Sequence, residues 1–252
     1  MANFDAFLFE GHGYSEKTGG FDSGATNGSI TENALVDAIV KSAKKYLDTT
    51  GKVIHYDENN FTDKDLAGNT YKYKCGMEVH INSATGASGV EIFVPCREKY
   101  IGSDVEIVKK ISNKLNIPNR GVKSRDYNTG NTFTRTNGQA LNYTDYYGSI
   151  RDAWSRGISL SILEVGFIQN DLSKIQANID VIGKYVAEYI AGCCDATIKV
   201  QEPSKPTQPN TSSGGTYFRV ICGSYKDRTN AEAQQAKLKK AGFDSFLEAF
   251  KK

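Results

Sequence analysis

The order of apolar and polar residues predicts an α/β domain over most of this chain. Short apolar runs are typical of buried strands, and they occupy residues 4–9, 52–56, 76–82, 90–94 and 158–163. Apolar residues recur at helical spacing over 31–47 and about 99–115, and a closing helix is expected over about 171–191. Because strands alternate with helices, the pattern predicts a central mixed, mostly parallel sheet flanked by helices.

Polar segments between these elements predict loops. Stretches rich in Gly, Ser, Thr and Asn occupy residues 14–29, 59–74, 83–89 and 116–148. The last of these is long enough to have a function of its own. In the helix at 99–115, the inner face is expected to carry Ile101, Val105, Val108 and residues 111–115.

The C-terminal quarter has a different composition. Residues 201–215 hold three of the five prolines and no large apolar side chain, which predicts a linker. Beyond it, a strand at 217–225, a helix at about 229–241 and a strand at 245–250 predict a small β-α-β segment. The predicted organisation is a main domain at 1–192, a linker at 193–215 and a small segment at 216–252.

Composition narrows the function classes. The chain has 252 residues and a formal charge of +2, which argues against nucleic-acid binding as the main task. No apolar run reaches the length of a membrane span, and no signal peptide is recognisable, so synthesis in the cytoplasm is expected. Five cysteines, with Cys193 next to Cys194 and no C-x-x-C pair, speak against a disulfide framework.

Four residues are candidates for metal-assisted catalysis. His12 stands in a Gly-His-Gly turn after the first strand, Glu32 begins the first helix, and His80 and Glu164 lie near the ends of two later strands. Two imidazoles and one carboxylate are enough for a catalytic zinc with an open fourth position. We therefore assign His12, Glu32 and His80 as Zn²⁺ ligands and Glu164 as the general acid/base.

Seven motifs follow one another along the chain: Gly11-His-Gly13, Asp22-Ser-Gly-Ala25, Glu32-Asn33, Val79-His-Ile-Asn82, Gly89-Val-Glu91, Arg120-Gly-Val-Lys123 and Leu163 to Asn170. In this order they resemble the zinc-dependent N-acetylmuramoyl-L-alanine amidases of the amidase 3 family. The resemblance covers residues 1 to about 192. It implies cleavage of the amide between the lactyl group of muramic acid and L-alanine in peptidoglycan, with ligands at His12, Glu32 and His80 and the catalytic glutamate at Glu164.

The sequence departs from the family pattern at several positions, one of which is Gln169 near Asn170. Phe9 and Glu10 replace the usual Asp-Pro before the first histidine, which leaves open what steadies that imidazole, and Glu78 replaces a common serine. Asn82 is a candidate for orienting a ligand or holding substrate. A cluster of aromatic residues either stacks on sugar or packs around a helix, and it consists of Tyr143, Tyr146, Tyr147 and Trp154.

After the linker come Tyr217-Phe-Arg-Val-Ile-Cys-Gly-Ser-Tyr225, Asn230-Ala-Glu-Ala233 and Leu238-Lys-Lys-Ala-Gly242. These stretches resemble the first half of a SPOR repeat, a module that binds peptidoglycan. Only one β-α-β unit is present, so two copies are expected to pair into a homodimer. The expected function is a cell-wall lytic enzyme that acts after release from the cytoplasm, as a phage endolysin or in mother-cell lysis. The competing hypotheses are a catalytically inactive wall-binding protein and a zinc carboxypeptidase.

Overall fold

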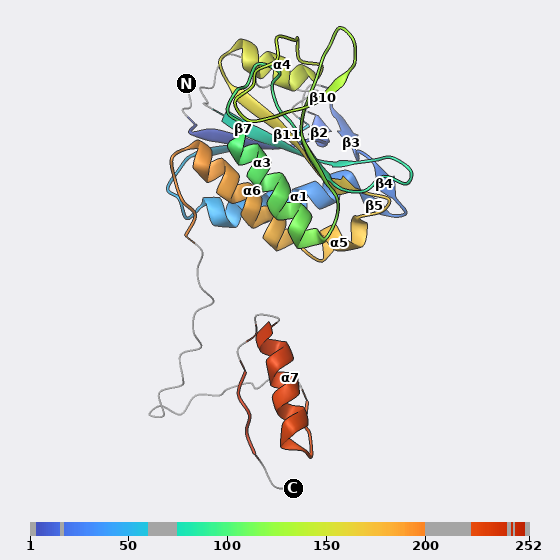
Figure 1. The fold of residues 1–252 in the computed structure, drawn as a ribbon, viewed down its shortest axis with the longest axis vertical. Coiled ribbons are helices and arrows are strands. Elements are labelled where there is room, and N and C mark those ends of the chain that lie inside the picture. The colour runs from blue at the N-terminus through green and yellow to red at the C-terminus, as the bar shows by residue number, and fades with distance from the viewer. Residues whose placement is uncertain are drawn as a thin grey trace. The chain divides into compact units, whose positions relative to one another are not determined.

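The computed structural model describes residues 4–15, 18–59, 75–199, 223–240, 243 and 245–249 (Figure 1). The chain divides into two compact units, residues 1–201 and residues 202–252. Each unit is described by itself. No helix among the described residues is both long and apolar enough to cross a bilayer.

The first unit is built on a seven-stranded mixed sheet. Its strands, in chain order, are β1 (Ala6–Glu10), β6 (Ile54–Glu58), β7 (Cys75–Asn82), β8 (Val90–Phe93), β9 (Asn119–Arg125), β10 (Thr132–Thr134) and β11 (Ser159–Phe167). The order across the sheet is β10-β9-β8-β11-β7-β1-β6. Strands β6, β1, β7 and β11 run parallel, β8 is antiparallel to β11, β9 is parallel to β8, and β10 is antiparallel to β9. The predicted mixed, mostly parallel sheet is confirmed.

Helices flank both faces of this sheet. They are α1 (Glu32–Leu47), α3 (Gly102–Leu115), α4 (Gly148–Ser155), α5 (Leu172–Gln176) and α6 (Ile179–Cys193). Helices α1, α3 and α6 cover one face, whereas α4 lies on the opposite side (Figure 1). Helix α1 begins where the sequence predicts, because the Thr31 hydroxyl accepts a hydrogen bond from the Ala34 amide and caps its first turn.

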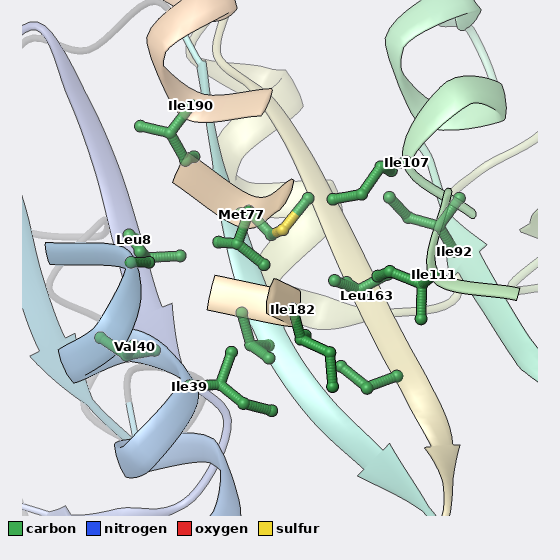
Figure 2. Packing of buried hydrophobic residues seen from close by; sticks show 14 of the residues in the cluster. Leu8, Ile39, Val40, Met77, Ile92, Ile107, Ile111, Leu163, Ile182 and Ile190 are labelled. Carbon is green, nitrogen blue, oxygen red and sulfur yellow. The ribbon is translucent and has the colours of Figure 1, made fainter. Parts of the chain in front are cut away.

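The main core lies between the sheet and the three-helix face. Leu8, Met77 and Leu163 from three parallel strands pack against Ile39 of α1 and Ile182 of α6 (Figure 2). Successive side chains on a strand point to opposite faces, so the residues between these apolar positions project toward the other side. There, a smaller cluster of Phe7, Phe9, Phe93 and Ile150 forms under α4.

Some predicted loops contain strands. Two short antiparallel strand pairs overlap the segment at 14–29: β2 (Gly13–Ser15) with β3 (Gly20–Asp22), and β4 (Thr26–Asn27) with β5 (Ile30–Thr31). The predicted loop at 116–148 was wrong in part, because β9 and β10 lie inside it. The residues of β9 and β10 are mostly polar, because the main core does not cover one face of this sheet edge. A search for apolar periodicity therefore does not detect these two strands.

Two helix predictions need correction. Val105 was expected on the inner face of α3 but is 42% exposed, because Asp104, one position earlier, takes the buried place. The closing helix is two helices, with Ala177 and Asn178 between α5 and α6.

The second unit contains α7 (Arg228–Lys240), which confirms the predicted helix. The expected strand at 245–250 is wrong over its described residues, 245–249, which have no regular structure. A strand needs a neighbour for its backbone hydrogen bonds, and the described residues of this unit supply none. Of the strand expected at 217–225, residues 223–225 are not in a strand and the others lie outside the described residues.

Candidate metal centre

The structure brings the three predicted ligands together. His12 follows β1, Glu32 is the first residue of α1, and His80 lies near the end of β7, which pairs with β1. One ligand atom from each residue lies within 4.8 Å of the other two. Because β1 and β7 are parallel neighbours, their carboxyl ends meet at one edge of the sheet, and α1 begins at the same place.

Glu32 is the centre of this cluster. Its Oε1 lies 3.4 Å from His12 Nε2 and 3.3 Å from His80 Nδ1, and it also accepts a 2.8 Å hydrogen bond from the Ile81 amide. Its Oε2 accepts a 3.0 Å bond from the Ala25 amide. Two backbone amides therefore fix the carboxylate of Glu32 between the two imidazoles.

A further group of contacts holds His12. Asp22 Oδ2 lies 2.9 Å from His12 Nδ1, and Asp22 Oδ1 accepts a bond from the Gly24 amide. The Asn33 side-chain amide donates to the His12 carbonyl over 3.1 Å. Asp22 thus supplies the carboxylate that orients the imidazole, although Phe9 stands where the family pattern has an aspartate before the Gly-His-Gly turn. The quoted motifs contain both residues, but sequence alone assigned neither a role.

Two glycines make the close approach of these side chains possible. A Cβ on Gly11 would overlap the His80 ring, so only glycine fits between the turn and β7. Gly24 has φ +63°, and a Cβ there would lie 2.7 Å from Glu32 Oε2 and from the His12 ring. The glycines flanking the candidate histidine and aspartate are therefore required by packing at the site itself.

The electrostatics favour a charged cluster. Burial opposes ionisation of Glu32, but its hydrogen bonds with His12 and His80 prevail and lower the pKa of this carboxyl. Burial lowers and Glu32 raises the pKa of both histidines, and the net direction is upward. The Glu32 carboxylate thus stabilises positive charge between the two rings. Protons on the imidazoles supply that charge, and a divalent cation bound there would supply it in their place.

Glu164 lies beside this cluster on β11, in register with His80 of β7. Its Oε2 is buried and has no hydrogen-bond partner among the described residues. Burial raises the pKa of Glu164 to about 7, with His80 lowering it and Glu32 and Glu91 raising it. A carboxyl group with that pKa can hold or release a proton near neutrality.

Asn82 contacts protein groups through both ends of its amide. Its nitrogen donates to Glu91 Oε1 over 3.0 Å, and its oxygen accepts from the Ser83 amide over 2.8 Å. Glu91 is buried on β8, where its other oxygen also receives Arg120 at 2.6 Å and Lys123. This network places Asn82 as a support for Glu91; its contact with substrate stays a prediction. Glu91 stands opposite Glu164 in the sheet register.

The departures from the family pattern also have places in the structure. Glu78 is buried on the same face of β7 as His80, and its Oε1 lies 3.4 Å from His80 Nε2. The two-residue spacing of Glu78 and His80 in a strand was a signal that sequence reasoning missed. Phe9 is buried and stacks on Phe7, whereas Glu10 is half-buried and burial raises its pKa to about 8.

The aromatic cluster divides between packing and exposure. Tyr147 packs on Phe93 with ring centroids 4.9 Å apart, which is the packing role. Tyr143 and Tyr146 are each 39% exposed, as a surface for sugar would need. Trp154 is half-buried on α4.

Two family models match parts of this chain. Residues 7–192 match the family described as N-acetylmuramoyl-L-alanine amidase, and residues 198–247 match the SPOR domain, a range that begins inside the expected linker. None of the curated protein sequences matches.

Solved structures share the fold at low sequence identity. Cwp6 from Clostridium difficile is 21% identical with a TM-score of 0.59, and the match covers 75% of this chain and 29% of Cwp6. A putative N-acetylmuramoyl-L-alanine amidase from Neisseria meningitidis is 20% identical with a TM-score of 0.50, over 77% of this chain and 98% of that one.

The amidase match covers well over half of the chain, and the sheet, its helices and the site lie within it. Residues 198–247 match the SPOR domain. The protein belongs to the N-acetylmuramoyl-L-alanine amidase family.

Proposed function

We propose that this protein is a zinc-dependent peptidoglycan hydrolase that cleaves the amide between N-acetylmuramic acid and L-alanine. The observation that carries the proposal is the convergence of His12, Glu32 and His80 within 4.8 Å at one sheet edge, next to Glu164. Membership of the amidase family supports an amide as the bond that is cleaved. The residues of the candidate metal centre support hydrolysis of that amide with the help of a metal ion and Glu164.

The residues present fit a zinc ion. Two imidazole nitrogens and one carboxylate oxygen are a common donor set for catalytic zinc. Asp22 fixes the orientation of His12, as the second group on a ligating histidine does in such sites. When bound, zinc supplies a Lewis acid that polarises the scissile carbonyl and acidifies a water molecule.

Glu164 has the role of proton carrier in this proposal. Its buried carboxylate takes a proton from the attacking water and gives it to the departing amine of L-alanine. A pKa of about 7, raised by burial, suits both steps near neutral pH. The unpartnered Oε2 leaves an acceptor that water and substrate can use.

The proposed role of Glu164 predicts a large loss of rate in Glu164→Gln. Amide and carboxyl have similar volumes, so the variant keeps the fold and the metal ligands but cannot carry the proton. We expect kcat to fall roughly 10²- to 10⁴-fold, with the zinc content unchanged. Glu106→Gln, at an exposed position on α3, is the matched control and should keep wild-type activity. Near-normal turnover by Glu164→Gln would remove this residue from the mechanism.

The identity of the bond is tested by mass spectrometry of the products from purified cell walls. The proposal requires free L-alanine amino termini and intact glycan strands. Release of a terminal amino acid would indicate a carboxypeptidase instead. Binding to walls without any product, with zinc bound, would indicate an inactive wall-binding protein.

We further propose that the SPOR domain holds the enzyme on peptidoglycan. Co-sedimentation with purified sacculi should be weaker for a chain that ends at residue 201 than for the full chain, and equal sedimentation would contradict this role. Pairing of two such segments predicts a homodimer, and light scattering during size-exclusion chromatography would report a monomer if the pairing is wrong.

The proposed setting is a lytic enzyme made in the cytoplasm that reaches the wall after release. Cells that express the chain should stay intact until their membrane is permeabilised and should then lyse. Lysis without permeabilisation would contradict this order of events.

A further inference from the structure

A half-buried arginine on β9 lies on the same side of the sheet as the candidate metal centre. Arg125 is the last residue of the strand, and its Nε donates to the Gly130 carbonyl over 3.1 Å. Its guanidinium lies 3.8 Å from the centre of the Tyr146 ring. A hydrogen bond and a cation–π contact thus hold the guanidinium in one orientation.

Arg125 has no acidic partner among the described residues, unlike its neighbours on β9. Arg120 and Lys123 both bind the buried carboxylate of Glu91, so that acid is already engaged. Arg135, which is buried, donates to four protein oxygens instead. A partly desolvated guanidinium without an anion is unfavourable, which argues that Arg125 receives an anion from outside the protein.

Tyr147 connects this arginine to the catalytic glutamate. Its ring packs on Phe93, and its hydroxyl interacts with the Arg125 guanidinium. Burial raises the pKa of Tyr147, and the same hydroxyl is close enough to Glu164 for the charge of that carboxylate to raise this pKa further. In the sheet, Glu164 pairs with Glu91 and Glu91 pairs with Gly121, four residues before Arg125. Two strand spacings and four residues along β9 place the Cα atoms of Glu164 and Arg125 on the order of 15 Å apart.

That separation suits a short peptide. Part of it is taken up by the two side chains, and extended peptide advances about 3.4 Å per residue. A group one or two residues beyond the scissile amide can therefore reach Arg125 while the amide lies at Glu164. A neutral N-acetyl sugar would leave the guanidinium without a counter-charge, so the glycan fits this position less well.

We propose that Arg125, supported by the Tyr146 ring, binds a free carboxylate of the stem peptide one residue beyond L-alanine, so that the enzyme prefers acidic over amidated stem peptides. This inference rests on the proposed amidase function. The planar guanidinium offers two parallel N–H groups that match a carboxylate, and an amide at that position supplies neither the charge nor the second acceptor.

The first test uses the wild-type enzyme and two matched muramoyl peptides. They differ only in the second residue of the stem, D-glutamate with a free α-carboxylate or D-isoglutamine with an amide. We expect KM to be about 10- to 100-fold lower for the acidic substrate, with similar kcat, because one charged contact distinguishes them. Equal KM values would overturn the inference. Hydrolysis of neither substrate would instead refute the proposed amidase function.

The second test uses Arg125→Gln. The variant should lose the preference by a rise in KM for the acidic substrate alone, and KM for the amidated one should stay as in wild type. Arg156→Gln, at the C-terminal end of α4, removes the same charge and should keep the preference. An equal loss on both substrates would assign Arg125 a structural role. If Arg125→Gln does not fold, Arg125→Lys keeps the charge, and an unchanged preference in it would contradict bidentate binding.

Discussion

A buried acid on α3 gives a quantitative prediction about the stability of the first unit. Asp104 Oδ1 accepts hydrogen bonds from Ser161 on β11 at 2.8 Å and from Tyr189 on α6 at 2.9 Å. Burial raises the pKa of Asp104 to about 6, although both hydrogen bonds oppose the rise. The cluster links α3 and α6 to the strand that carries Glu164, so its protonation bears on the scaffold of the site.

The direction of the pH dependence follows from these values. In the unfolded chain Asp104 ionises near pH 3.8, whereas in the folded protein it stays protonated until about pH 6. Between pH 3.8 and about pH 6, Asp104 is ionised in the unfolded chain but protonated in the folded protein. The free energy of unfolding therefore falls as the pH rises through this range. A shift of roughly 2 units corresponds to about 3 kcal/mol, most of it between pH 4 and pH 7.

Asp104→Asn removes this titration, because the amide oxygen still accepts from both hydroxyls and carries no charge. The variant should exceed wild type in free energy of unfolding by roughly 2 kcal/mol more at pH 7 than at pH 4. Urea titrations followed by fluorescence measure this in the first unit, since the only tryptophan is Trp154 on α4.

Asp48→Asn, at an exposed carboxylate after α1, is the control and should show no such change with pH. A difference between wild type and Asp104→Asn that stays constant from pH 4 to pH 7 would refute the reasoning. It would mean that water or local opening solvates Asp104 in the folded protein.

Three further predictions concern the metal centre. Gly11→Ala places a methyl group in the His80 ring, so zinc affinity measured by competition with a chelating dye should fall at least 100-fold with the fold kept by circular dichroism. Asp22→Asn should lower zinc affinity about 10- to 100-fold, because the amide holds His12 less firmly, and unchanged affinity would deny Asp22 this role. Glu78→Gln removes a negative charge beside His80 and should lower the pKa of that imidazole in NMR titrations of the metal-free protein, whereas a rise would contradict the assigned contact.

Much of the fold was predictable because local pattern and tertiary structure agree. The helix capped by Thr31 and the apolar strands around Leu8 and Leu163 bury the side chains that their periodicity selects. The prediction failed at β9 and β10, where polar residues pair at a sheet edge, and at Val105, where hydrogen bonds draw Asp104 into the interior instead.

The residues of the candidate metal centre were predictable because strand ends and a helix start collect at one edge, and because the family motifs single out the same positions. Their supports were not, since each depends on pairing between distant segments. Asp22 reaches His12 only because β2 and β3 form a hairpin, and Glu91 reaches Asn82 only because β8 folds back beside β11. Arg125 gains its place from Tyr146, which lies beyond β10 in the chain.

X-ray absorption spectroscopy of the zinc-loaded protein tests the central claim most directly. We expect one zinc ion per chain, with two imidazole nitrogens at about 2.0–2.1 Å and oxygen ligands at about 2.0–2.2 Å, and loss of this spectrum in His80→Ala. Failure to bind zinc, a sulfur shell at about 2.3 Å, or an unchanged spectrum in His80→Ala would contradict a metal centre at His12, Glu32 and His80.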